Sequence, residues 1–233
     1  MDLKERYNRQ LILPEIGEEG QARLQQARVL IVGVGGLGSP IALYLTGAGV
    51  GTIGLIDDDV VSESNLQRQV LYNEKEVGLS KAEKAREHLQ ALNSHVCIEA
   101  YPERLTAENA EAIIGQYDLV LDGCDNFATR YLINDTCVRL GKVYIYGAIR
   151  AFDGQVSVFN YQGGPDYRRL FPDEEEMYRM PHPPKGVLGV TPGLIGCAEA
   201  NEALKIIVGY GEVLSGKLWQ IDLKTLETFT ILI

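Results

Sequence analysis

Three groups of residues in this sequence have the types and the spacing to bind the phosphates of a nucleotide. The first is the run "GVGGLG", in which Gly33, Gly35 and Gly38 fit the pattern G-x-G-x-x-G, with Gly36 between them. In this pattern the first glycine permits a sharp turn, the second a close backbone approach to a phosphate, and the third tight packing of the following helix. That helix would point free N–H groups and the positive end of its dipole at the ligand. A tight turn packed on a sheet without a ligand is the alternative interpretation.

The second group lies in "LIDDDVVSESNLQRQ", residues 55–69. Asp57 follows Gly38 by 19 positions (57 − 38), where a carboxylate can bind the ribose hydroxyls of a nucleotide. Beyond it stands Arg68, which a dehydrogenase does not need. A guanidinium is a planar fork that can grip two phosphate oxygens. The polar residues of this stretch that we expect to face the nucleotide are Ser64, Asn65, Gln67 and Arg68.

A third group of charged residues follows other expected strands. Lys81 begins a helix in "VGLSKAEKAR", and Asp122, Asp125 and Asn126 follow the strand in "YDLVLDGCDN". Because ligands of a doubly wound sheet bind at the carboxyl ends of its strands, these residues and Arg68 should converge on the glycine turn. Two cations suit a triphosphate, and an acid suits Mg²⁺, which takes one or two carboxylates plus phosphate oxygens. Lysine is common at surface helix starts, so the convergence carries more weight than any single residue.

The elements that must position these groups alternate between strands and helices. A β-branched strand, the glycine turn and an apolar helix span residues 28–50. Further strands are expected within residues 51–59, 96–102, 117–126 and 142–149, and helices at 17–27, 79–92, 106–115 and 127–141. The alternation predicts an α/β fold with a doubly wound, Rossmann-like, mostly parallel sheet, in a single domain over residues 1–233.

The last third of the chain departs from that alternation. Residues 154–161, "GQVSVFNY", and 216–233 predict antiparallel strands that continue the sheet. Between them, residues 162–186 hold five prolines and an acidic run, and we expect an irregular loop that crosses the active site, since loops this long are usually functional or disordered. Residues 191–209 predict an apolar helix with Thr191 as its cap.

Composition and charge limit the classes of function. The chain of 233 residues carries a net charge of −10, which argues against nucleic-acid or anionic-membrane binding. No apolar run approaches the roughly 18 residues that span a bilayer, and the N-terminus lacks the apolar core of a signal peptide. We therefore expect a cytoplasmic protein. Four cysteines without a C-x-x-C pair indicate neither a zinc ribbon nor a disulfide framework, and we expect Cys97 and Cys197 to be packing residues.

The glycine turn also raises the alternative of an NAD-dependent dehydrogenase. Such an enzyme needs a proton-transfer residue, usually a histidine or a lysine. His88 and His95 lie near the end of a polar helix and in the loop after it, and neither marks a site for hydride transfer. Together with Arg68, this makes a dehydrogenase the least favoured class.

Six motifs spread almost from end to end carry a family resemblance. They are "YNRQ" (7–10), "GVGGLG" (33–38), "IDDDVVSESNLQRQ" (56–69), "VGLSK" (77–81), "DGCDN" (122–126) and "GVLGVTPGLIG" (186–196). Together they resemble the ThiF/MoeB/HesA family, the bacterial relatives of ubiquitin-activating enzymes. Members use ATP and Mg²⁺ to adenylate the C-terminal glycine of a small ubiquitin-like sulfur-carrier protein that ends in Gly-Gly. The resemblance thus implies an adenylyltransferase that forms an acyl-adenylate and releases pyrophosphate, in thiamin, molybdopterin or another pathway.

The resemblance also implies roles for individual residues. It implies that Asp57 holds the ribose, that Asn65, Arg68 and Lys81 hold phosphates, and that Asp125 holds Mg²⁺. It implies a homodimer in which Arg9 extends to the partner's nucleotide. The residues expected to be catalytic are Arg9, Arg68, Lys81 and Asp125; those expected to contact the nucleotide are Gly33, Gly35, Gly36, Gly38, Asp57, Ser64, Asn65, Gln67, Arg68, Lys81, Asp125 and Asn126.

Elementary chemistry agrees with this activity. The attacking group would be a carboxylate with a pKa of about 3.5, which is already ionised at neutral pH. No general base is needed, so the lack of a histidine among these motifs is no defect. The difficulty is bringing an anion to an anionic phosphate, and preplaced positive charge meets it.

The chain departs from the family where most members bind zinc. Asp166 and Arg169 in "GPDYRRLF" stand where most members have the cysteines of "PCYRC", and the later C-x-x-C does not occur. His182 stands where the family has a loop cysteine. We therefore expect no structural zinc, no thioester step, a solvated His182 and a packing role for Cys124.

Two other functions remain open from the sequence. One is adenylation of another peptide or of an RNA-linked substrate. The other is a nucleotide-binding scaffold without catalysis, which the joint presence of Arg9, Arg68, Lys81 and Asp125 argues against.

Overall fold

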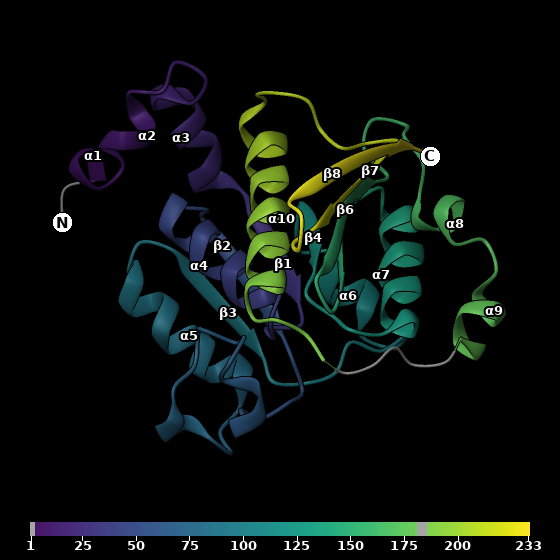
Figure 1. The fold of residues 1–233 in the computed structure, drawn as a ribbon. Coiled ribbons are helices and arrows are strands. Elements are labelled where there is room, and N and C mark those ends of the chain that lie inside the picture. Colours follow the sequence, from purple (N-terminus) through teal and green to yellow (C-terminus); the bar gives the residue numbers. More distant parts are fainter. Residues whose placement is uncertain (1–2, 181–185) are drawn as a thin grey trace.

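An eight-stranded sheet forms the centre of the computed structural model, which describes residues 3–180 and 186–233 (Figure 1). Its strand order is β3-β2-β1-β4-β5-β6-β7-β8. The first five strands pair in parallel and the last three antiparallel, which confirms the predicted doubly wound sheet with an antiparallel continuation. The strands are β1 (Arg28–Val32), β2 (Thr52–Ile56), β3 (Cys97–Tyr101), β4 (Leu119–Asp122), β5 (Val143–Arg150), β6 (Asp153–Phe159), β7 (Lys217–Asp222) and β8 (Glu227–Leu232).

Helices cover both faces of this sheet (Figure 1). On one face α10 packs against α4 and α3, and α5 packs beside α4; on the other face α7 contacts α6, α8 and α9. The helices are α1 (Leu3–Arg6), α2 (Asn8–Leu11), α3 (Gly17–Gln26), α4 (Gly38–Ala48), α5 (Lys81–Leu92), α6 (Ala110–Ile114), α7 (Phe127–Leu140), α8 (Tyr167–Leu170), α9 (Glu174–Arg179) and α10 (Val190–Val208). Within the described residues, none of the helices combines the length and the apolar character needed to cross a bilayer.

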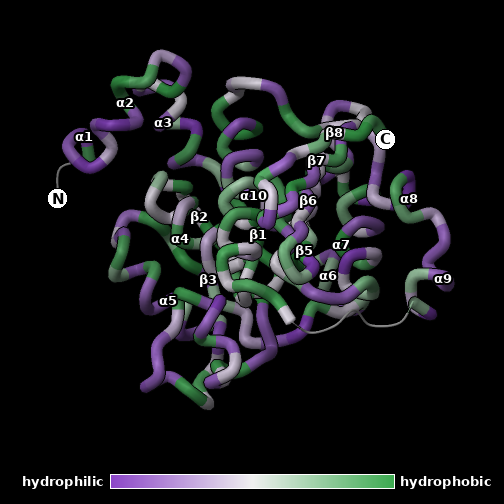
Figure 2. The backbone as a smooth tube through the Cα atoms, in the orientation of Figure 1, coloured by the Kyte–Doolittle hydropathy of each residue, from purple (hydrophilic) through white to green (hydrophobic). Residues whose placement is uncertain are grey.

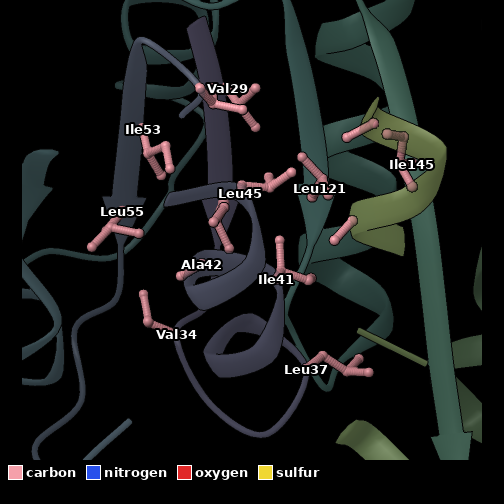
Figure 3. Packing of buried hydrophobic residues seen from close by; sticks show 14 of the residues in the cluster. Val29, Val34, Leu37, Ile41, Ala42, Leu45, Ile53, Leu55, Leu121 and Ile145 are labelled. Atoms are coloured by element: carbon pink, nitrogen blue, oxygen red, sulfur yellow. The ribbon is translucent and has the colours of Figure 1, made fainter. Parts of the chain in front are cut away.

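The core lies in two layers because the central strands are buried on both sides. Val29 and Ile31 of β1 face the α4 and α10 side, where Ile41 and Leu45 of α4 cover them (Figure 3). Leu30, between them, faces the α7 side, as the alternation of a strand requires. Each fully buried side chain of this kind contributes roughly 1.5–3 kcal/mol to stability. Figure 2 shows hydrophobic residues concentrated toward the centre of the molecule.

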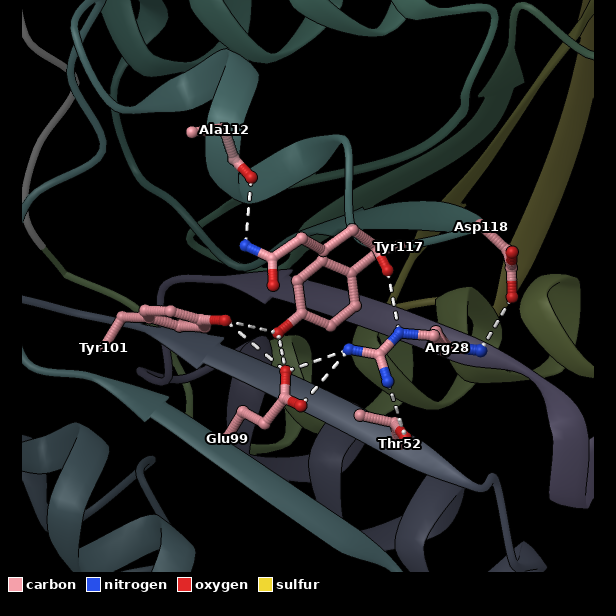
Figure 4. Close-up of polar contacts among 8 residues, drawn as sticks. Arg28, Thr52, Glu99, Tyr101, Ala112, Tyr117 and Asp118 are labelled. Atoms are coloured by element: carbon pink, nitrogen blue, oxygen red, sulfur yellow. Dashed lines mark hydrogen bonds and ion pairs between the residues drawn. The ribbon is translucent and has the colours of Figure 1, made fainter.

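A polar network closes the amino end of the sheet (Figure 4). Arg28 donates to both carboxylate oxygens of Glu99 at 3.2 Å, to the Gln116 carbonyl at 2.8 Å and to the Thr52 hydroxyl at 3.3 Å. The Tyr117 hydroxyl donates to Glu99 at 2.5 Å. Burial acts to raise the pKa of Glu99, but the hydrogen bonds from Tyr117 and Arg28 outweigh it and the pKa is lowered. The network joins β1, β2 and β3 at the end opposite to the glycine turn.

The segment expected to be irregular contains two short helices, so that prediction was wrong for its first part. Asp166 caps α8 and Asp173 caps α9. Arg168 fastens the segment to α7, because its guanidinium donates to the two Asp135 oxygens at 2.8 and 2.7 Å and to Glu174 at 2.8 Å. Residues 181–185, which include His182, lie outside the described residues, so the crossing of the active site and the state of His182 remain predictions.

Two smaller expectations were also wrong. Helix α10 begins at Val190, with Gly189 as its cap, and the Thr191 hydroxyl donates instead to the Ala151 carbonyl at 3.0 Å. Cys97 is exposed rather than packed in the core, because β3 is the edge strand of the sheet.

Candidate active site

The glycine turn between β1 and α4 brings distant backbone segments into close contact. Gly33 has a φ of +88°, which glycine adopts at little cost, and its N–H donates to the Ile56 carbonyl at 2.8 Å. A β carbon on Gly33 would lie 2.6 Å from the Gly123 carbonyl oxygen, and one on Gly38 would lie 2.1 Å from the Gly33 carbonyl oxygen. Glycine is therefore needed at both positions, and the turn lies directly beside the loop that follows β4.

Asp57, directly after β2, is fixed against this turn. Its Oδ2 accepts from the Val34 N–H at 2.7 Å, and its Oδ1 accepts from the Asp59 N–H at 2.9 Å. Burial raises the pKa of Asp57, although the Val34 bond and the charge of Lys81 act against the rise. Each carboxylate oxygen can accept a further hydrogen bond. Asp57 is thus oriented by the backbone and can still accept from hydroxyl groups of a ligand.

The stretch "SNLQRQ" folds so that Arg68 lies beside the turn. The 3₁₀ helix η1 (Glu63–Asn65) begins it, and the Asn65 carbonyl accepts from the Arg68 N–H at 3.0 Å. The Arg68 guanidinium donates to the Ser64 carbonyl at 3.0 Å. The Cδ of Arg68 lies 3.7 Å from the position that a β carbon on Gly36 would take. The sequence-based prediction that Arg68 and the glycine turn converge is therefore confirmed.

Gln69 and the start of α10 also line the turn, although neither was among the residues that we expected to contact the nucleotide. Gln69 is buried, and its Nε2 would lie 3.3 Å from a β carbon on Gly35. The start of α10 also lies here, since the Cβ of Pro192 lies 3.2 Å from the position that a β carbon on Gly36 would take. The only sequence signal for this second contact was the family motif at residues 186–196.

Lys81 places a buried positive charge at the start of α5. Its side chain is 5% exposed, and Nζ donates to Asp59 Oδ2 at 2.8 Å. The Asp59 side chain is 71% exposed, so solvent screens this pair. The Tyr72 hydroxyl lies within hydrogen-bonding distance of the Val34 carbonyl, at 2.8 Å, and of the Lys81 carbonyl, at 3.3 Å. Tyr72 thereby joins the start of α5 to the glycine turn.

Asp122, the last residue of β4, is not available to a ligand. It is fully buried, and its carboxylate accepts from Arg130 Nε at 2.9 Å, from the Tyr144 hydroxyl at 2.8 Å and from the Cys124 N–H at 2.9 Å. Of the acid pair expected at this edge, Asp125 is the member that faces solvent.

Arg130, on the buried side of the loop after β4, fixes this loop through hydrogen bonds. Sequence analysis did not predict this role of Arg130. Asp125 and Asn126 are exposed, and Asn126 caps the first turn of α7. Arg130 donates to the Cys124 carbonyl at 3.1 Å as well as to Asp122. The available signal was the spacing in "DGCDNFATR", which places Arg130 one turn into the helix that follows the loop.

The acids of the site offer one compact group of possible cation ligands among the described residues. Oxygen atoms of Asp57, Asp58 and Asp59 lie within 4.8 Å of one another, but Asp57 already accepts from backbone and Asp59 from Lys81. Asp125 belongs to no such group in the described part of the chain. As a magnesium ligand it would have to act together with phosphate oxygens, which is the arrangement that Mg²⁺ favours.

Arg9 does not lie in the site of its own chain. It is exposed on α2, whose neighbouring Gln10 donates to the Ala48 carbonyl at 3.1 Å, at the C-terminal end of α4. Tyr7 is buried and its hydroxyl accepts from Asn93 at 2.8 Å. The glycine turn lies at the other end of α4, whose 11 residues span about 16 Å (Figure 1). In "YNRQ", Tyr7 and Gln10 anchor the segment and Arg9 remains exposed.

The cysteines do not form a reactive centre with these residues. All four thiols are free. Burial and the charge of Asp122 raise the pKa of Cys124 well above its usual value, which disfavours the nucleophilic thiolate. Cys124 packs against the core on the α7 side, as predicted.

Comparison with known proteins places these features in a family. Residues 7–233 match the ThiF family. The chain is 48% identical over 232 residues to a probable molybdopterin-synthase adenylyltransferase of Porphyra purpurea, an alignment that covers 97% of this chain and 60% of that protein. It is 51% identical over 224 residues to a sulfur carrier protein adenylyltransferase of Thermus thermophilus, which covers 94% of this chain and 83% of that protein.

Solved structures agree on the fold. A structure of E. coli MccB with succinimide has a TM-score of 0.86 at 22% identity, covering 97% of this chain and 71% of the MccB chain. A structure of PaaA has a TM-score of 0.84 at 25% identity, covering 99% of this chain and 73% of that chain. With the glycine turn, the buried lysine and the arginine of "SNLQRQ" in one place, and with these matches over nearly its whole length, the chain belongs to the ThiF family.

Proposed function

We propose that this protein uses ATP to adenylate the C-terminal glycine carboxylate of a ubiquitin-like sulfur-carrier protein that ends in Gly-Gly. The observation that carries the proposal is the covered positive charge of Lys81, 5% exposed, which lies with Arg68 around the glycine turn. The Thermus thermophilus relative, of which this chain spans 83%, is named for adenylation of a sulfur carrier protein. The chain spans only 60% of the length of the Porphyra protein. That this chain carries out the activity for which its relatives are named is therefore part of the proposal.

The reaction needs charge and position rather than a base. An oxygen of the ionised glycine carboxylate attacks the α-phosphorus of ATP, the bond from that phosphorus to the bridging oxygen breaks, and pyrophosphate leaves with the electron pair. The products are the acyl-adenylate and pyrophosphate. Lys81 and Arg68 counter the negative charge that accumulates as the two anions meet. The carboxylate is already deprotonated at neutral pH, so the site requires no catalytic histidine.

Each residue at the carboxyl edge has a task in this scheme. Asp57 binds the ribose, and Asn65, Arg68 and Lys81 bind phosphates, with the glycine turn offering the backbone N–H groups that follow Val34. The remaining nucleotide contacts are Gly35, Gly36, Gly38, Ser64, Gln67 and Asn126. Asp125 would hold Mg²⁺, which supplies further countercharge to the phosphates when bound.

The proposal includes a homodimer in which each site is completed by the partner. Support comes from the place of Arg9, which is exposed near the far end of α4 and therefore free to serve a neighbouring molecule. A two-fold interface makes such an exchange reciprocal. We further propose a cytoplasmic protein of thiamin or molybdopterin biosynthesis that holds no structural zinc. The segment at residues 162–186, which includes α8 and α9, would cross the site.

Exchange of labelled pyrophosphate into ATP tests the proposal. The purified protein with Mg²⁺ and a carrier ending in Gly-Gly should catalyse the exchange, since adenylate formation is reversible. The matched control is the same carrier without its last glycine, which should give none. Exchange that proceeds equally without any carrier, or fails with every candidate carrier while the protein is folded, contradicts the proposed function.

A further inference from the structure

Helix α10 carries two buried glutamates, three residues apart, in opposite surroundings. Glu202 is 3% exposed, pairs with Lys205 and accepts from the Leu214 N–H at 2.9 Å. Glu199 is 0% exposed, and neither of its carboxyl oxygens has a partner at normal hydrogen-bond geometry within the described residues. An ionised carboxylate in such a place is strongly unfavourable. Unlike Glu202, Glu199 has no cation of its own helix beside it in the described part of α10.

Glycine in β5 makes the room for the Glu199 carboxyl. A β carbon on Gly147 would lie 2.0 Å from Glu199 Oε1 and 3.0 Å from Oε2, so the carboxyl rests directly on the strand. Ile145 faces the α10 side and Tyr146 faces the α7 side, which places the open side of Gly147 toward α10. The Gly147 carbonyl accepts from Arg130 Nη2 at 3.3 Å. Glu199 of α10 and Arg130 of α7 therefore both contact Gly147, from opposite sides of the sheet.

The charges around Glu199 are few and can be named element by element. Burial first, and then the charge of Asp122 on β4, raise the pKa of Glu199 well above its ordinary value, while Arg130 on α7 and the backbone N–H of Asp122 act against the rise. Arg23 of α3 contacts the Val208 carbonyl, at the far end of α10.

The other neighbours add no countercharge. On α10 itself, Lys205 is paired with Glu202. Helix α4 has no charged residue. In β6, Val156 pairs with Gly147, and Asp153 lies exposed at the strand start. In β5, Tyr144 and Tyr146 face the α7 side. Thus Arg130, already bound to Asp122, is the cation that an ionised Glu199 would attract.

We propose that Glu199 is protonated in the folded protein and acts as a positioning residue, since its neutral carboxyl leaves Arg130 bound to Asp122 and to the Cys124 carbonyl and so holds the loop that presents Asp125. Ionisation would draw the guanidinium toward the α10 side and loosen that loop. The inference that Glu199 is protonated follows from its burial and its neighbours and does not depend on the proposed function. The effect on catalysis rests on the proposed function of Asp125.

Glu199→Gln tests the protonation, because glutamine keeps the shape and the neutral charge. On unfolding, Glu199 returns to a pKa of about 4.3 and releases its proton, so the stability it gives falls as the pH rises above that value. In urea unfolding, the unfolding constant of the wild type relative to Glu199→Gln should rise about tenfold from pH 6 to pH 7. The matched control Glu202→Gln should give a ratio that does not change over this range. A constant ratio for Glu199→Gln overturns the proposal.

An infrared comparison gives a second readout at neutral pH. The wild type should show the carbonyl stretch of a protonated carboxylic acid that Glu199→Gln lacks and that Glu202→Gln retains. Identical bands in all three proteins overturn the protonation.

Pyrophosphate exchange then tests the positioning role. At pH 7, Glu199→Gln should exchange as fast as the wild type, and with rising pH the wild type should lose activity earlier than the variant. Superimposable pH profiles overturn the positioning role. If the wild type shows no exchange at all, the proposed function and the positioning role both fail, while the unfolding slope still decides whether Glu199 is protonated.

Discussion

The two ends of the parallel sheet both gather charged side chains, but they leave them in different states. At the amino end, Arg28 is bound by Glu99, Thr52 and the Gln116 carbonyl (Figure 4). At the carboxyl end, Lys81 has one exposed carboxylate partner and Arg68 one backbone carbonyl in the described structure. A satisfied network makes the sheet rigid, whereas cations with donors to spare, placed at the carboxyl ends of strands, suit an anionic ligand. The difference separates residues that support the fold from residues that serve the reaction.

The largest effect should follow from removal of the covered cation at the carboxyl end. Lys81→Ala should lower carrier-dependent pyrophosphate exchange by about 10²–10³-fold, as the loss of other preorganised donors does. Lys84→Ala is the matched control on the same helix, because Lys84 pairs with Glu87, and it should retain the exchange rate. A Lys81→Ala protein that is folded, as circular dichroism would show, and still exchanges at the wild-type rate would remove Lys81 from the site.

A mixture of two inactive variants tests whether the carboxyl edge needs a second chain. Arg9→Ala and Arg68→Ala should each be inactive, yet a heterodimer of the two has one site with both arginines. Random mixing should therefore restore about a quarter of the wild-type rate, since half of the dimers carry one intact site. Differently tagged subunits allow the heterodimer to be purified. An inactive heterodimer would speak against an arginine supplied by the partner.

At the amino end, the effect should be on stability and not on activity. Arg28→Met should lower the free energy of unfolding by about 1–2 kcal/mol at pH 7, with allowance for solvent at a partly exposed pair, and leave the exchange rate unchanged. The lowered pKa of Glu99 gives the sign of the pH dependence. Stability from this group is present above the unfolded-state pKa and is lost as the pH falls through the folded-state pKa.

The stability difference between the wild type and Arg28→Met should therefore be largest near neutral pH and shrink under acid. Urea unfolding at pH 7, 5 and 4 measures it. A gap that widens toward low pH would show that Arg28 does not support Glu99 in the folded state.

The smallest effect is expected from Gly47, near the C-terminal end of α4, and Gly38 at the other end of this helix serves as the contrast. Gly47 is exposed and has open space where a β carbon would stand, so Gly47→Ala should raise stability by about 0.5–1 kcal/mol and leave the exchange rate unchanged. Gly38→Ala would place a carbon 2.1 Å from the Gly33 carbonyl oxygen and should abolish nucleotide binding. Calorimetry with ATP compares the two variants, and equal affinities would show that the turn geometry does not matter for binding.

Sequence reasoning recovered the parts of the fold that repeat a simple period. Val29 and Ile31 alternate with Leu30 along one strand, and that alternation is legible in the letters alone. The convergence of Arg68 on the glycine turn was also predictable, because the carboxyl ends of strands form one edge.

Contacts between residues distant in sequence were harder to foresee. The Asp122–Arg130 ion pair depends on how α7 packs back against β4. The burial of the Glu199 carboxyl depends on the space that the missing side chain of Gly147 leaves. The helices α8 and α9 were missed although Asp166 and Asp173 are cap residues, because the prolines around them dominated the pattern.

The fate of a label on ATP tests the central claim most directly. The wild-type protein is incubated with Mg²⁺, a carrier ending in Gly-Gly, and ATP labelled with ³²P either at the α- or at the γ-phosphate, and the carrier is then isolated under acid. If the cations at the carboxyl edge serve adenylation, label from the α-phosphate should appear on the carrier and label from the γ-phosphate should leave in pyrophosphate. Label from the γ-phosphate on the carrier, or none from either in a protein that consumes ATP, would contradict the account.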